Sequence, residues 1–254
     1  MSNRWIARLA GFMLVAGFAA AQAPTGIKVS KKEMDAYNSV INAPSPDMQI
    51  QEADKFVTSF ADSKLKGTVL FFAANAAERK GDTTKAIVYA QSSLDADPNN
   101  FQAMILIAGE LARGTKEFDL DKEEKLARAD KLATQAMEVV KDAPKPNPQL
   151  TDDKWNGFKK DFSAQAHEDL GMSAVVRKKY DVAITEFKTA IDTEATPNAT
   201  TMLRLAAAYD QAGKPDDALA TLAKVSALPD LEPSLKPFIE HEKVNAEKLK
   251  AGKK

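Results

Sequence analysis

The sequence predicts an all-α protein built from repeated helix pairs. Apolar residues recur at the period of an amphipathic helix through most of the chain, and no run of alternating β-branched residues indicates a strand. Turn-forming residues gather in four short segments, and each segment separates two helical patterns of about 12 to 16 residues. These segments are 78–84, 95–100, 177–181 and 211–217. A chain of 254 residues is also long for one compact core.

The composition narrows the class of protein. Lys and Arg number 35 and Asp and Glu 36, for a formal net charge of −1, so no positive field attracts nucleic acid or an anionic membrane. The chain has no Cys and two His, His167 and His241, whose neighbours do not provide the spacing of a zinc site. Neither a Gly-rich phosphate loop nor a Gly-x-Ser-x-Gly motif is present. We therefore expect no catalytic residue, no metal, no cofactor and no nucleic-acid partner.

Residues 1–21 have the pattern of a secretory signal peptide. Arg4 and Arg8 precede an apolar run that ends in small residues at Ala21. The run of about 13 residues is shorter than the roughly 20 that a membrane-spanning helix needs. We expect cleavage near Ala21 and a flexible N-terminus over 22–30. The mature chain, without a membrane span, is then expected in the periplasm, the cell envelope or the extracellular space. An uncleaved anchoring helix is the alternative.

The helical patterns repeat along the chain. A Leu-small pair, followed at fixed offsets by Ala and a bulky apolar residue, occurs twice, 35 residues apart. The two sets are Leu170, Gly171, Ala183 and Phe187, and Leu205, Ala206, Ala218 and Leu222. This pattern resembles the tetratricopeptide repeat, a pair of helices of about 34 residues, here of the exported bacterial envelope type.

The resemblance implies an α-solenoid of antiparallel helix pairs that form a right-handed superhelix with a concave groove. It also explains the apolar stripe of "KYDVAITEFKTAI" at 179–191, in which small residues let two helices approach and Phe187 fills the space between them. We expect four to five repeats.

The repeats divide the rest of the chain into units. The predicted units are a divergent first repeat at 31–66, two repeats at 67–141 with an inserted loop near 114–125, a Pro-rich connector at 142–151, two repeats at 152–232, and a capping helix with a basic tail at 233–254. The connector is either a bend between two blocks of repeats or a rigid segment packed on the surface, and the sequence leaves both open.

The resemblance also identifies candidate binding positions. Repeats that bind the acidic C-termini of chaperone clients use a Lys and an Asn four residues apart. Here Asn75 matches the Asn, but Phe71 occupies the Lys position, so this carboxylate clamp is not expected. By repeat phase, the residues expected to line the groove are Phe71, Asn75, Glu78, Ile105, Glu168, Met172, Leu203 and Asp210. Their mixture of apolar and acidic side chains favours an extended or helical protein segment over an anionic ligand.

The sequence therefore predicts a non-catalytic scaffold that binds another protein in the cell envelope. The alternative is an accessory protein that binds a peptide, a glycan or a small molecule.

Overall fold

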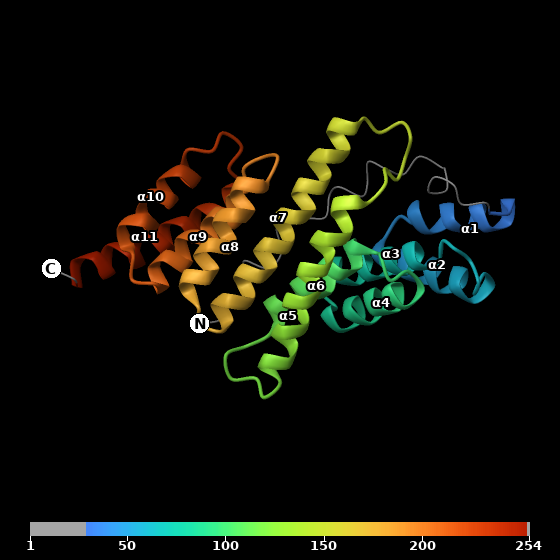
Figure 1. Ribbon diagram of the computed structural model, residues 1–254, viewed down its shortest axis with the longest axis horizontal. Coiled ribbons are helices and arrows are strands. Elements are labelled where there is room, and N and C mark those ends of the chain that lie inside the picture. The colour runs from blue at the N-terminus through green and yellow to red at the C-terminus, as the bar shows by residue number, and fades with distance from the viewer. Residues whose placement is uncertain (1–28, 253–254) are drawn as a thin grey trace.

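A computed structural model describes residues 29–252, and over this range it contains eleven α-helices, one short 3-10 helix and no strand. The helices follow one another along the long axis of the molecule, from α1 to α11 (Figure 1). The predicted all-α solenoid is therefore confirmed. The predicted signal peptide, 1–21, and most of the predicted flexible segment, 22–30, lie outside the described residues.

The helices form five consecutive pairs followed by a final helix. The elements are α1 (Lys31–Ile41), α2 (Pro46–Ser59), α3 (Lys66–Arg79), α4 (Thr83–Ala96), α5 (Phe101–Gly114), α6 (Lys122–Asp142), α7 (Asp152–Val176), α8 (Tyr180–Thr193), α9 (Ala199–Gln211), α10 (Pro215–Ser226), η3 (Pro233–Leu235) and α11 (Lys236–Gly252). Each α-helix packs against the next one in the chain. The first helices of successive pairs also meet, because α1 packs on α3, α3 on α5 and α5 on α7.

Side-chain caps begin several helices where turn residues interrupt the helical pattern. The Ser45 hydroxyl accepts a hydrogen bond from the Met48 N–H (3.2 Å), and the Asn100 side chain accepts one from the Ala103 N–H (3.1 Å). Thr151 accepts from the Lys154 N–H (3.3 Å) at the start of α7. Each cap satisfies a backbone donor that the first helical turn leaves without a partner.

The turns between the helices of three pairs share one backbone conformation. Gly81 and Gly213 have positive φ angles of 73° and 72°, and Lys178 has the same conformation with φ 60°. Glycine adopts this left-handed region without steric cost, whereas a side chain there costs about 1–2 kcal/mol. Lys178 is therefore a strained residue at a position where the other two turns use Gly.

Close packing within a pair depends on small residues at the contact. A Cβ atom added to Gly171 of α7 would lie 2.6 Å from the Phe187 ring, which is buried on α8. Ala183 of α8 is also fully buried. The glycine is needed because no side chain fits between α7 and the aromatic ring.

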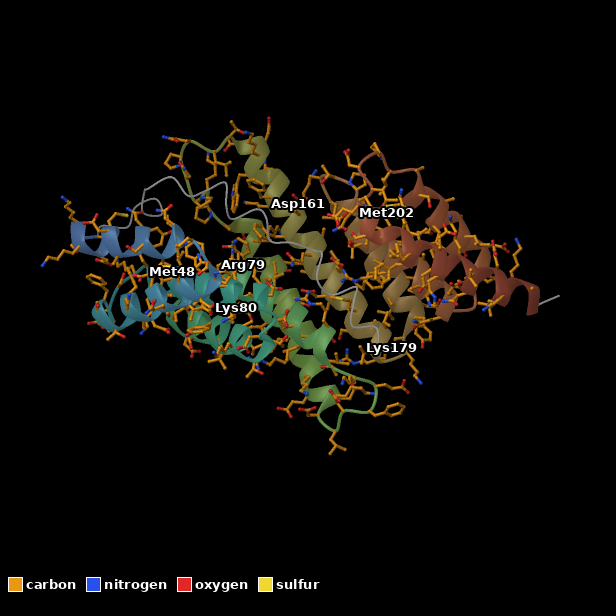
Figure 2. All side chains as sticks on the ribbon, turned by 180° about the vertical axis from the view of Figure 1, so that it is seen from behind. Met48, Arg79, Lys80, Asp161, Lys179 and Met202 are labelled. Atoms are coloured by element: carbon orange, nitrogen blue, oxygen red, sulfur yellow. The ribbon has the colours of Figure 1, made fainter. Side chains whose placement is uncertain are left out.

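The first pair is joined to the second by polar contacts as well as by apolar packing. Arg79 of α3 donates to the Gln49 side chain of α2, and Lys80 pairs with Asp47. Figure 2 shows Arg79 and Lys80 beside Met48, the residue between these two partners. The divergent start of the chain is thus continuous with the solenoid.

The connector between α6 and α7 is held by side chains from both of its ends. Trp155 donates from Nε1 to the Ala143 carbonyl (3.0 Å), and Lys159 donates to the Lys141 carbonyl (2.9 Å). Lys145 also pairs with Asp152 at 2.8 Å. Helices α6 and α7, with 21 and 25 residues, project beyond their neighbours and carry the connector at one edge (Figure 1). These contacts favour the packed connector over a free bend.

Candidate functional site

The structure places three of the eight predicted groove residues in the core. Phe71, Ile105 and Leu203 are each at most 2% exposed, so a partner cannot reach their side chains without unfolding the helix pair. Each first helix is enclosed by its own second helix and by neighbouring pairs, and repeat phase alone does not show how much of it remains accessible. This part of the groove prediction is corrected by the structure. Met172 is half-buried and packs against two apolar clusters of the core.

The polar residues of the predicted set mark a different feature, a line of charged side chains across the first helices. We call it the ion-pair row, and its members are Glu78 on α3, Glu110 and Arg113 on α5, Glu168 and Asp169 on α7, and Arg204 on α9. Only Glu78 and Glu168 of this row are among the predicted residues. Asn75, one turn before Glu78, is buried, and its Nδ2 has no hydrogen-bond partner among the described residues.

Arg113 is the centre of the ion-pair row. Its Nη2 atom lies 2.7 Å from Glu110 Oε1 and 3.1 Å from Glu78 Oε1, and the other Glu110 oxygen accepts from the Thr83 hydroxyl at 2.6 Å. Burial lowers the pKa of Arg113, but the nearby Asp169, Glu110 and Glu78 raise it by more than burial lowers it. The guanidinium therefore stays charged. One largely buried cation therefore contacts acids of two helix pairs, and it faces a third acid, Asp169, from the next pair.

Gly109 makes room for this arrangement. A Cβ atom at this position would lie 2.8 Å from Arg113 Nη1 and 3.0 Å from Asp169 Oδ1. The absence of a side chain lets the guanidinium fold back over α5 and lets Asp169 approach from α7. The side chains of Arg113 and Asp169 thus meet over Gly109 and join helix pair α5–α6 to helix pair α7–α8.

Asp169 is buried, and its Oδ2 atom has no hydrogen-bond partner among the described residues. Burial raises the pKa of Asp169 to about 8, Arg113 opposes the shift, and Glu78 and Glu110 add to it. The carboxyl group is therefore mostly protonated at neutral pH. With Asp169 neutral, three carboxylates face two guanidinium groups, and the row keeps a negative excess.

The row continues to α9 through a second ion pair. Glu168, which is buried, is in direct contact with the Arg204 guanidinium. A buried charge is tolerated where an opposite charge compensates it. This ion pair links helix pair α7–α8 to helix pair α9–α10, just as Arg113 links α5–α6 to α7–α8.

Asp210, the last of the predicted groove residues, lies near the C-terminal end of α9. Neither carboxyl oxygen has a hydrogen-bond partner among the described residues. Burial raises the pKa of Asp210 to about 6, and Glu242 of α11 adds to the shift. The structure therefore places Asp210 beside the capping helix, away from the ion-pair row.

The two histidines do not form a metal centre in the part of the chain that the structure describes, where no group of three or more His, Cys, Asp or Glu side chains can hold an ion. His167 Nδ1 instead lies 2.8 Å from Glu186 Oε2, which joins α7 to α8.

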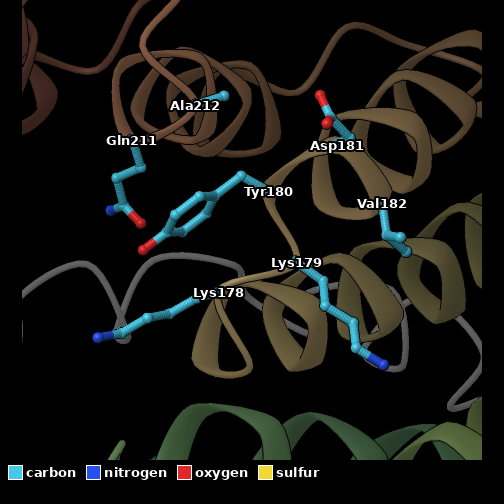
Figure 3. A pocket seen from close by; sticks show the side chains of 7 residues that line it. All are labelled: Lys178, Lys179, Tyr180, Asp181, Val182, Gln211 and Ala212. Atoms are coloured by element: carbon cyan, nitrogen blue, oxygen red, sulfur yellow. The ribbon is translucent and has the colours of Figure 1, made fainter.

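A shallow pocket of about 440 Å³ lies between the α7–α8 turn and the end of α9. Its lining residues are Lys178, Lys179, Tyr180, Asp181, Val182, Gln211 and Ala212. Figure 3 shows the Tyr180 hydroxyl directed toward the Gln211 side chain, with the Lys178 and Lys179 side chains extending away from them. The lining is predominantly polar and lies at the edge of the solenoid.

Four residues of the ion-pair row were not predicted from the sequence. These residues are Glu110, Arg113, Asp169 and Arg204. One signal for two of them is present, because an acid and an Arg three residues apart on a helix can pair. Gly109, directly before this pair, is a second signal, since a mid-helix Gly often marks a close approach. Nothing local indicates that Asp169 and Arg204 meet the same row.

Over residues 29–252, no helix combines the length and the apolar character that crossing a lipid bilayer requires.

Comparison with known proteins identifies the repeats. A family model for the tetratricopeptide repeat matches residues 177–233. No curated protein matches the chain in sequence. Among solved structures, TTC0263, a thermophilic tetratricopeptide repeat protein from Thermus thermophilus, is similar with a TM-score of 0.55 and 17% identity, over 78% of this chain and 90% of that one. MamA (41-end) from Desulfovibrio magneticus is similar with a TM-score of 0.50 and 15% identity, over 78% and 96%.

These identities are low, so the two structures support the fold and nothing beyond it. The matched segment, 177–233, begins at the α7–α8 turn and extends through α9 and α10, where the sequence pattern is most regular. We conclude that residues 177–233 match the tetratricopeptide repeat and that the chain has a solenoid fold like that of tetratricopeptide repeat proteins.

Proposed function

We propose that this protein is an exported, non-catalytic scaffold that binds a segment of another protein along its first-helix face. Tetratricopeptide repeats commonly support protein–protein interaction, and stacked helix pairs offer an extended surface for it. Phe71, Ile105 and Leu203 are enclosed, and among the residues of the ion-pair row Glu78 has the most accessible side chain. The recognition chemistry of this face therefore depends on the charged residues.

The observation that carries the proposal is the ion-pair row across four consecutive first helices. Structural ion pairs normally balance, whereas this row, with Asp169 protonated, has three carboxylates and two Arg. Glu78 is the most accessible acid of the Arg113 group, with 24% of its side chain exposed. An approaching Lys or Arg would offset the negative excess, so the proposed partner segment carries basic side chains.

Partner binding is tested with the full chain in intact cells of its source. The tagged protein is cross-linked, what co-purifies is identified by mass spectrometry, and the partner is purified for titration. Glu78→Gln keeps the shape of the side chain and removes its charge. We expect affinity about tenfold weaker, close to the 1.5 kcal/mol or so that a hydrogen bond to a charged group contributes.

Glu138→Gln is the matched control, because Glu138 is exposed on α6, a second helix. Equal affinities of the Glu78 and Glu138 variants would remove the first-helix face from the proposal. Recovery of a bound peptide or glycan and no protein would instead support the accessory role.

Export is tested separately by fractionating the same cells and sequencing the N-terminus of the recovered protein. The apolar run that ends at Ala21 is what supports export, and the expected mature chain begins at Gln22. Recovery of the uncleaved chain from the cytosol would contradict this part of the proposal and leave the partner-binding part intact.

A further inference from the structure

The last helix of the chain covers the end of the solenoid. Helix α11 packs against both α9 and α10 at the C-terminal end of the molecule (Figure 1). Ile239 and Ala246 are the buried residues of this helix, and Glu242 lies three residues after one and four before the other. Side chains at this spacing share one face of a helix. Glu242, which is half-buried, therefore lies in the interface with the last helix pair.

Helix α9 places a second acid on the surface that α11 covers. Leu203, Ala206 and Asp210 follow one another at spacings of three and four residues, so they share one face of α9. Leu203 and Ala206 belong to the apolar cluster that Ile239 completes. Asp210 continues this apolar face with a carboxyl group whose two oxygens are covered and have no hydrogen-bond partner among the described residues.

The two acids act on each other without a base between them. Burial and Glu242 raise the pKa of Asp210, and no other charged group of the described residues shifts it. Burial also raises the pKa of Glu242, whereas the neighbouring His241 and a hydrogen bond with Asn245 lower it. A proton on this pair is therefore held mainly by Asp210.

Three lysines of the surrounding elements pair with other acids. Their ion pairs are Lys214 with Asp181 of α8 at 2.7 Å, Lys250 of α11 with Asp216 of α10 at 2.6 Å, and Lys243 with Glu240 on α11 at 2.9 Å. Asp217 of α10 acts on Lys214 and does not shift the pKa of Asp210. The negative charge that the two acids can carry between α9 and α11 is thus left uncompensated.

We propose that Asp210 and Glu242 form an acid latch, which holds α11 on α9 while the pair retains a proton and weakens once both carboxyl groups are ionised. Two ionised carboxylates at close range repel each other, and a covered carboxylate without a donor loses its hydration. Both costs disappear when α11 detaches and the two side chains reach water. The cover over the apolar end of the last pair, Leu203, Leu222 and Val225, therefore depends on pH.

The direction of the pH dependence follows from the proton on Asp210. Its pKa is about 6 with α11 attached, whereas an Asp in water has a pKa near 3.9. The contribution of the acid latch is fully present below about pH 4 and is lost as the pH rises through about 6. Acid medium thus closes the end of the solenoid, and neutral medium opens it more often.

The test measures backbone hydrogen exchange in the full chain at pH 5 and pH 7, with each rate corrected for the intrinsic exchange rate at that pH. Peptides from α11 report its detachment, and peptides from α2, at the opposite end of the solenoid, are the internal reference. Relative to α2, we expect the protection of α11 to fall about tenfold from pH 5 to pH 7, because the detached form has lost the proton that the attached form retains.

Three variants assign this change to the acid latch. Asp210→Asn keeps the shape of the side chain but cannot ionise, so the protection of α11 is expected to be the same at both pH values. Glu242→Gln removes the facing charge and leaves Asp210 covered, so a smaller dependence is expected to remain. Glu247→Gln is the matched control, because Glu247 is exposed on the same helix, and it should behave as the wild type does.

Two outcomes would overturn the acid latch. One is a protection of α11 that does not fall relative to α2 as the pH rises, and the other is the same fall in the wild type and in Asp210→Asn. Loss of the dependence in Glu247→Gln would also contradict it, because the effect would then belong to the charge of α11 as a whole. None of these measurements involves a partner, so the acid latch and the proposed binding at Glu78 can fail independently.

Discussion

Asp169 shows how enclosure changes the chemistry of one side chain. The carboxyl group lies between α5 and α7, beside a buried guanidinium that two other acids already share. Burial raises its pKa to about 8, whereas an Asp in an unfolded chain has a pKa near 3.9. The residue therefore binds a proton when the chain folds at neutral pH.

This proton makes the stability of the protein depend on pH. Between about pH 4 and pH 8 the folded state holds a proton at Asp169 that the unfolded state has lost, so the Asp169 contribution to the free energy of unfolding decreases as pH rises through this window. Asp169→Asn removes this contribution. Urea unfolding at pH 5 and pH 8 is expected to show the variant gaining stability relative to the wild type at the higher pH. A difference between the two proteins that does not change with pH would contradict the assignment.

At the scale of the element, α7 contains two glycines with opposite roles. Gly171 faces Phe187 of α8 at a distance that leaves no room for a Cβ atom, whereas a Cβ atom at Gly157 would have no atom within 4 Å. One glycine is required by packing, and the other only lowers the helix propensity of α7.

Alanine at each position separates the two roles. Gly171→Ala is expected to lower the free energy of unfolding by about 1–3 kcal/mol, because the methyl group would displace the Phe187 ring. Gly157→Ala, the matched control on the same helix, is expected to raise it by about 0.5–1 kcal/mol. Chemical denaturation measures both. Equal effects at the two sites would mean that α7 and α8 are not packed as closely as described.

At the scale of the whole molecule, the solenoid needs an end that covers its last apolar face. Leu235 of η3 and Ile239 of α11 complete a cluster with Leu203, Leu222 and Val225 of the last pair. Stacked repeats contact mainly their neighbours, so removing the end exposes the next unit instead of loosening the whole core equally.

A chain that ends at residue 232 is expected to melt at a lower temperature. Losing the buried Ile239 alone corresponds to about 2–5 kcal/mol, and each kcal/mol shifts the melting temperature of a domain of this size by about 2–4 °C. Circular dichroism and the binding of a hydrophobic dye would report the loss. Val244→Ala, at an exposed position of α11, is the control and should change little. An unchanged melting temperature without dye binding would mean that α11 is not a cap.

The sequence by itself determined the helices, their pairing and the turns of this protein, because these features depend on local periodicity and on a few special residues. The spacing of Leu170 and Gly171 relative to Phe187 already specified a close-packed pair, and the turn residues at 78–84 and 211–217 marked where helices end. These are interactions between residues close in the chain, and general rules for helices describe them.

Only the tertiary structure decided which residues are accessible and which charges meet. Phe71, Ile105 and Leu203 have the predicted helical phase but are covered by neighbouring pairs, and Arg113 meets Asp169 because Gly109 lets α5 and α7 approach. The angles and distances between helices depend on packing along the entire stack, which no local pattern encodes. For that physical reason the fold could be predicted from the sequence, whereas the ion-pair row required the structure.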